Sequence, residues 1–137
     1  SLANSNCNDT VDIQGVCTDI DLLYNLITSS KNDANYSNIN NLLNVYKANP
    51  CEMRLLLSTR KTINDIAYSS LLHEAAKNNH VSVSAAIFQK ASFVGDYQTY
   101  LKFAKELANA TDVNNKKPID YTTNQQLIDL LKRFMEL

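Results

Sequence analysis

The segment 70–83, with the sequence SLLHEAAKNNHVSV, constrains the fold of this chain more than any other stretch. Its first half has the apolar spacing of a short helix, Asn78 and Asn79 make a polar break, and the residues after His80 begin a second apolar helix. This order of helix, break and helix is that of one unit in a stack of helical repeats. We therefore expect a stack of short helix pairs, an architecture that usually binds other proteins.

Apolar residues recur at helical spacing along most of the remaining chain. They form stripes within 20–27, 39–46, 53–57, 97–108 and 127–134. Alternating strand patterns are nearly absent, and two glycines and two prolines leave little material for tight hairpins. The sequence predicts an all-α fold, an irregular stack built from about seven or eight short helices.

Polar segments suggest how the chain is divided. Residues 1–17 are rich in asparagine and lack periodicity, so we expect a flexible N-terminal arm. Residues 18–137 are long enough for a single domain with one modest core. Within that domain, residues 58–69 are polar and are predicted to be irregular.

Short polar side chains ahead of apolar runs predict where helices begin. Ser70 precedes the first helix of the opening segment, and Asn49 stands before a proline that is suited to a first helical turn. Thr123, with a glutamine three residues later, is predicted to cap the last helix.

Several residues of the opening segment resemble the ankyrin repeat, whose unit runs Thr-Pro-Leu-His-x-Ala-Ala and continues through Asn-Gly-His into a second helix. The matching residues are Ser70 at the threonine, Leu72, His73, Ala75, Ala76, Asn79 at the glycine, and His80. Asparagine tolerates the left-handed backbone that the glycine position needs. The resemblance implies one well-matched unit at 70–91.

Weaker traces of the same unit flank this segment. They lie at 55–65, at 112–121 and at 127–131, so the ankyrin-like region covers about 54–137. Leu71 and Pro118, which occupy the same place in two units, are 47 residues apart, whereas the family period is about 33. The helix at 96–110 is therefore expected to be an insertion.

Ankyrin units bind other proteins through their connectors and through the face of their first helices, and the resemblance implies the same here. The motif's placement puts the expected partner-binding residues at Asp65, Tyr68, Lys77, Asn78, Asn115 and Lys116. We expect another protein as the partner, no catalytic residue, no cofactor and no metal site.

Composition argues against several other partners. The net charge is −1, and the lysine pair at 116–117 is too small to contact the phosphates of a nucleic acid. The longest apolar runs are only a few residues, which excludes a membrane span by hydropathy. Neither a nucleic acid nor a membrane is an expected partner.

The histidines and cysteines are the residues that a catalytic interpretation would use. The ankyrin resemblance implies that His73 and His80 bond backbone groups at the turns. Cys51 begins a helix, where a thiol pKa is lowered. Three cysteines with no CxxC spacing favour reduced thiols in an intracellular, cytoplasmic protein, and a Cys7–Cys17 bridge in an oxidising setting is the alternative.

Three alternative interpretations stay open at this point. The chain could be a stand-alone helical bundle with a structural or regulatory role, whose core uses residues 20–57 as heavily as 70–134. It could be a small enzyme that uses Cys51 or His73. The 18 asparagines and the ankyrin resemblance also fit an effector-like protein that a host-associated microbe secretes into a host cell.

Overall fold

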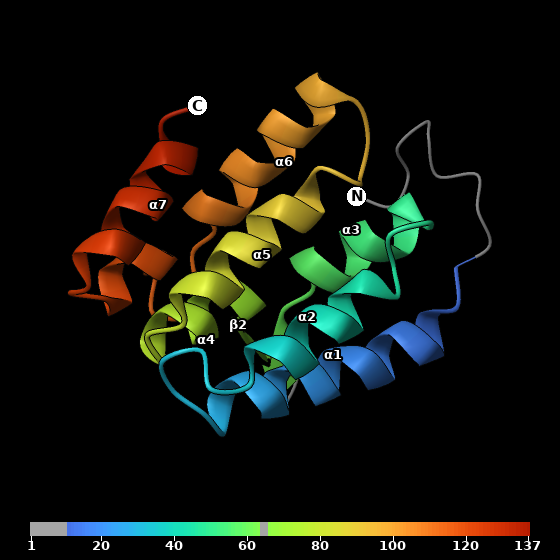
Figure 1. Ribbon diagram of the computed structural model, residues 1–137, viewed down its shortest axis with the longest axis horizontal. Coiled ribbons are helices and arrows are strands. Elements are labelled where there is room, and N and C mark those ends of the chain that lie inside the picture. The colour runs from blue at the N-terminus through green and yellow to red at the C-terminus, as the bar shows by residue number, and fades with distance from the viewer. Residues whose placement is uncertain (1–10, 64–65) are drawn as a thin grey trace.

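The computed structural model describes residues 11–63 and 66–137, with the side chains of residues 63 and 66–68 excluded. The elements in this part of the chain are α1 (Ile13–Thr28), α2 (Tyr36–Asn44), α3 (Pro50–Ser58), β1 (Lys61–Ile63), β2 (Ile66–Ser69), α4 (Leu71–Lys77), α5 (Val81–Ala91), α6 (Tyr97–Asn109), the 3₁₀-helix η1 (Pro118–Tyr121) and α7 (Gln125–Met135). The predicted all-α class is confirmed (Figure 1).

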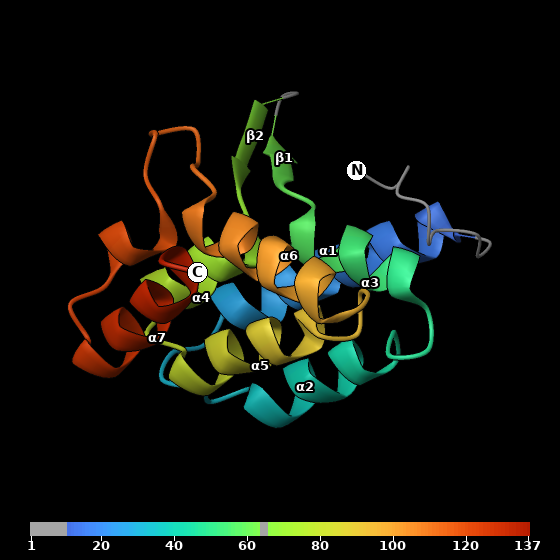
Figure 2. The same ribbon diagram turned by 90° about the horizontal axis from the view of Figure 1, so that it is seen from above.

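The helices are arranged in three successive units. The first unit (13–69) holds α1, α2, α3 and the β1–β2 hairpin, the second unit (71–117) holds α4, α5 and α6, and the third unit (118–135) holds η1 and α7. The first helices α1, α4 and η1 pack side by side, and so do the second helices α2, α5 and α7. Figure 2 shows the hairpin and the connector that follows α6 projecting from the same side of the helices.

Each of the two complete units contains a third helix, which decides whether α6 is the predicted insertion. Helix α6 follows α5 and packs against α7 of the next unit, and α3 likewise follows α2 and packs against α5 of the next unit. A third helix therefore recurs in both complete units, so α6 is a regular part of the unit where the sequence predicted an insertion.

Side-chain amides connect the turns of the three units. Asn79 donates to the Oδ1 of Asn32 at 2.6 Å, and the Oδ1 of Asn79 accepts from Asn124 at 2.7 Å. These partners are 47 and 45 residues apart in sequence, which is the spacing of the units. Asn79 has the left-handed backbone that was predicted, with φ of 57°.

The buried core is continuous through the units. Its largest fully buried side chains include Leu23, Leu43 and Leu56 from the first unit and Leu72 and Ile87 from the second. The core thus uses both halves of the chain, as the bundle interpretation expected, while the helices follow the unit order that the repeat interpretation expected. The two interpretations are compatible in this fold.

The N-terminal boundary differs from the prediction. Helix α1 begins at Ile13, so residues 13–17 are helical where the sequence predicted a flexible arm, and residues 1–10 lie outside the described part. Asp12 caps the helix by accepting from the Gly15 N–H at 3.0 Å. Val16 is buried, and its packing stabilises the first turn of α1. The apolar pattern of this turn is too short to predict a helix from the sequence.

Residues 61–63 and 66–69 also differ, because they form two antiparallel strands where irregular backbone was predicted. The pairing includes an irregularity between Lys61 and Thr62. An apolar alternation of only three or four residues is too short to indicate a strand from sequence.

The helix caps agree with the prediction at two of three places. Asn49 accepts from the Glu52 N–H at 3.0 Å, and Ser70 accepts from the His73 N–H at 3.3 Å. The last helix is capped by Asn124, which accepts from the Gln126 N–H at 3.0 Å, and not by Thr123.

Candidate partner-binding surfaces

His73 is completely buried, and both of its ring nitrogens contact backbone or cap groups. Nδ1 accepts from the Ser70 N–H at 3.3 Å and lies 2.7 Å from the Ser70 hydroxyl, while Nε2 lies 2.9 Å from the carbonyl oxygen of Lys116. Burial lowers the pKa of His73. The prediction that His73 bonds backbone groups is confirmed, and the imidazole connects α4 to the connector ahead of the third unit.

His80 makes the corresponding connection to the first unit. Its Nδ1 accepts from the Asp33 N–H at 2.8 Å, and its Nε2 lies 2.9 Å from the carbonyl oxygen of Ile27. The Asp33 carboxylate in turn accepts from the N–H groups of Ser82 and Val83 and thereby caps the start of α5. The predicted backbone role of His80 is therefore also confirmed.

Asp112 organises the connector that carries Asn115 and Lys116. Its carboxylate accepts from the Tyr121 hydroxyl, from the Asn114 N–H at 2.9 Å and from the Lys116 N–H at 3.0 Å. Burial acts to raise the pKa of Asp112, but these donated hydrogen bonds outweigh burial and lower it. Burial and the bond to this carboxylate raise the pKa of Tyr121.

Two of the predicted partner-binding residues meet on the ring of Tyr121. The ammonium of Lys77 lies 4.7 Å from the ring centroid, and the ammonium of Lys116 lies 5.7 Å from it. Lys77 also pairs with Glu74 at 2.7 Å. Both lysines are exposed and belong to the second unit, so the Tyr121 ring of the third unit presents two cations of the preceding unit to solvent.

The other predicted residues fall into two groups. Asn115 is exposed at the tip of the connector with a left-handed φ of 59°, and Asn78 ends α4, where its amide donates to the Glu74 carbonyl at 2.8 Å. Asp65 lies outside the described residues, and Tyr68 lies in β2 with its side chain outside the description. The structure thus brings Lys77 and Lys116 together and leaves the hairpin residues untested.

Sequence reasoning missed Tyr121, which stands at the centre of this group. We call Lys77, Lys116 and Tyr121 the connector patch. A signal for Tyr121 was present, because it ends the segment 118–121 that was assigned to the opening of a unit. Its contacts with Lys77 depend on the packing of η1 against α4, which no local pattern reveals.

The cysteines differ from the prediction of reduced thiols. Cys51 is fully buried and disulfide-bonded, so it cannot be the reactive thiol of a catalytic site. Cys17 is an exposed free thiol, so the alternative bridge that would have used it is wrong as well, and Cys7 lies outside the described residues.

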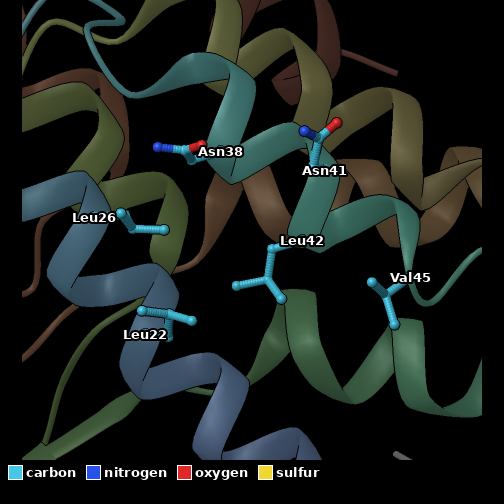
Figure 3. A pocket seen from close by; sticks show the side chains of 6 residues that line it. All are labelled: Leu22, Leu26, Asn38, Asn41, Leu42 and Val45. Carbon is cyan, nitrogen blue, oxygen red and sulfur yellow. The ribbon is translucent and has the colours of Figure 1, made fainter.

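A second surface, an apolar groove between α1 and α2, was not predicted. It has a volume of about 470 Å³ and is lined by Leu22, Leu26, Asn38, Asn41, Leu42 and Val45. Figure 3 shows the leucines of α1 and Leu42 of α2 pointing into the space between the two helices. Leu22 is 46% exposed and Val45 is 70% exposed, which is unusual for large apolar side chains that lie together.

Other kinds of site were searched for in the described residues. No group of three or more histidine, cysteine, aspartate or glutamate side chains in residues 11–63 and 66–137 could hold a metal ion. Among the helices described, none has both the length and the apolar character needed to cross a membrane. The chain was also compared with family models, curated proteins and solved structures, and none of these comparisons gave a match.

Proposed function

We propose that the chain is a protein-interaction module that binds a protein partner through its connectors and the face of its first helices. The observation that carries the proposal is the meeting of Lys77 and Lys116 on the ring of Tyr121. Tyrosine is one of the residue types enriched at binding hot spots, and the ring of Tyr121 is partly buried and held in place by neighbouring groups. The ankyrin resemblance of segment 70–91 agrees with this function.

The connector patch favours an acidic segment of the partner. Lys116 attracts carboxylates, and so does Lys77, although Lys77 also pairs with Glu74. Asp112 is buried, and its carboxylate holds Tyr121 rather than facing solvent. His73 and Asp112 hold the connector in one conformation, which lowers the entropy lost on binding.

The enzyme alternative has lost its two candidate residues. His73 is completely buried and has both nitrogens engaged, and Cys51 is buried in a disulfide. We therefore place the enzyme alternative behind an interaction role. The bundle alternative remains a description of the same core and suggests no other activity.

The disulfide at Cys51 bears on where such a module would act. Disulfides persist in oxidising compartments and are rare in the reducing cytoplasm. The proposal therefore favours action outside a reducing cytoplasm over the intracellular location expected from sequence. The effector-like role in a host rests only on the asparagine-rich composition and the ankyrin resemblance.

The proposal is tested by capturing partners from candidate lysates and quantifying them by mass spectrometry. The bait is the wild-type chain, the double variant Lys77→Glu/Lys116→Glu, or the single variant Lys102→Glu, which reverses an exposed charge on α6. We expect specific partners to be retained by wild type and by Lys102→Glu and reduced at least tenfold by the double variant. Circular dichroism would verify that all three are folded.

Equal capture by the double variant and by wild type would show that the connector patch is not the binding surface. Failure of every bait to enrich any protein over beads alone would argue against an interaction role in the lysates used.

A further inference from the structure

The groove between α1 and α2 includes a face of α2 whose equivalents in the later units pack against the preceding unit. Helix α2 begins at Tyr36 and α5 begins at Val81, so an offset of 45 residues aligns these two second helices. Under this offset Asn38, Asn41 and Leu42 of α2, and Val45 directly after its end, correspond in order to Val83, Ala86, Ile87 and Lys90. All four of these α5 residues are buried, whereas Asn38, Asn41 and Val45 are exposed.

The residues equivalent to Val45 in the second and third units show what this position contacts there. Its counterpart Lys90 donates from Nζ to the Oδ1 of Asn40 at 3.2 Å, and Asn40 belongs to α2 of the preceding unit. Helices α5 and α7 begin at Val81 and Gln125, an offset of 44 residues, so the counterpart in α7 is Phe134. Its ring stacks on Phe88 of α5 with centroids 4.0 Å apart. In both later units this position therefore contacts the second helix of the unit before it.

The first unit presents the same face to solvent. Terminal units of a helical stack are normally polar on their outer side. The opposite end of this stack follows that rule, because the outward residues of α7 are polar and exposed, namely Gln125, Gln126, Asp129, Lys132 and Arg133. The end formed by α1 and α2 does not follow it, since Leu22 and Val45 are exposed there.

The charges beside the groove indicate what kind of helix fits. Helices α1 and α2 contain no lysine or arginine. Of their two carboxylates, Asp21 lines a separate pocket with Arg60 and Lys61, which leaves Asp19 as the charge on the groove side of these helices. Asp19 lies one helical turn before Leu22, and its carboxylate accepts from the hydroxyl of Tyr46, the residue that follows Val45. A basic helix is attracted to this face, whereas a second copy of the chain would bring two acidic helices together.

We propose that the α1–α2 groove binds an amphipathic α-helix of another protein, placed as the second helix of a preceding unit would be. This helix carries apolar residues at positions i, i+3, i+4 and i+7, and a lysine or arginine at the end next to Asp19. The groove is a different surface from the connector patch, so the two proposals can fail separately.

The test uses two synthetic probes and the full chain. Both probes are fluorescein-labelled, stapled helical peptides with leucines at i, i+3, i+4 and i+7. One is flanked by lysines and the other by glutamates. Fluorescence anisotropy is expected to show that the lysine probe binds at least tenfold more tightly than the glutamate probe, and that added salt reduces this preference.

Matched variants locate the binding. Leu22→Ser/Val45→Ser removes two exposed apolar groups and is expected to weaken the lysine probe at least tenfold, whereas Val113→Ser, at an equally exposed apolar residue on the connector, leaves it unchanged. Asp19→Asn keeps an acceptor for Tyr46 and is expected to reduce the preference for the lysine probe. Lys77→Glu/Lys116→Glu is expected to bind the probe like wild type.

Three outcomes would overturn the proposal. These are that neither probe binds, that the glutamate probe binds as well as the lysine probe, or that the serine double variant binds like wild type. Light scattering after size-exclusion chromatography adds a further check: a wild-type dimer that Leu22→Ser/Val45→Ser converts to a monomer would identify a second copy as the occupant instead.

Discussion

The side chain of Asn79 donates to the Oδ1 of Asn32 at 2.6 Å and joins the turn of the second unit to that of the first. Asn79 also adopts a left-handed backbone with φ of 57°. One residue therefore both reverses the chain between α4 and α5 and positions the neighbouring unit. This double role makes Asn79 the most direct test of the unit arrangement.

Replacing Asn79 with alanine should lower the free energy of unfolding by about 2 kcal/mol. Alanine in a left-handed conformation costs about 1 kcal/mol more than asparagine or glycine, and the lost amide bonds account for about another 1 kcal/mol. Asn79→Gly keeps the conformation and should cost only about 1 kcal/mol. Urea unfolding measures both values, and equal losses for alanine and glycine would show that the backbone conformation contributes nothing.

His73 should make stability depend on pH in the acidic range. Burial lowers the pKa of His73 in the folded state, so the unfolded chain binds the proton more readily. The stabilising contribution is complete above the unfolded pKa of about 6.5, and it is lost as pH falls through the folded value. The melting temperature of wild type should therefore fall between pH 7.5 and pH 5.

His73→Gln removes this titration while an amide N–H replaces Nε2–H toward the Lys116 carbonyl. At pH 7.5 the variant should be less stable by about 1–2 kcal/mol, because the acceptor for Ser70 is lost. Its melting temperature should change less between pH 7.5 and pH 5 than that of wild type. The same change in both proteins would mean that other groups cause the pH dependence.

The stacked rings of Phe88 and Phe134 join α5 to α7, with an interplanar angle of 9°. Phe134→Ala should lower the free energy of unfolding by about 2–3 kcal/mol, since Phe134 is half-buried and loses both burial and the ring contact. Phe134→Leu keeps most of the volume and should cost only about 1 kcal/mol. Chemical denaturation distinguishes them, and similar losses would argue that the ring contact is unimportant.

The two described cysteines should differ in reactivity. Iodoacetamide added to the native protein is expected to modify Cys17, which is exposed and free. Cys51 is buried in a disulfide and should be modified only after unfolding with a reductant. Peptide mapping by mass spectrometry reports both sites. Modification of Cys51 without a reductant would contradict the disulfide.

Local sequence patterns predicted the elements that are stabilised by interactions within a few residues. Ser70 caps α4 because a short hydroxyl side chain ahead of an apolar run satisfies a free N–H. Asn79 was predicted to be left-handed because it stands at the glycine position of the ankyrin-like unit and asparagine tolerates that conformation. The N-terminal turn of α1 and the β1–β2 pair were missed, since their apolar patterns are short and packing stabilises them.

Contacts between units could not be predicted in the same way. Lys90 is a charged residue on a helix, and sequence alone would place it in solvent, yet it is buried against Asn40. Tyr121 becomes part of a surface only because η1 packs beside α4, where Lys77 and Lys116 reach its ring.

The sequence by itself determined the all-α class, most helix starts and the turn at Asn79, because these depend on hydrogen bonds and apolar spacing within a few residues. Only the tertiary structure decided that a third helix recurs in each complete unit, that Lys77 and Lys116 share one ring, and that Leu22 and Val45 stay exposed. The physical reason is that burial depends on which neighbour covers a residue. Val45 and Lys90 occupy equivalent positions, and Lys90 is buried because it packs against α2 of the preceding unit, whereas none of the described residues covers Val45 in the same way.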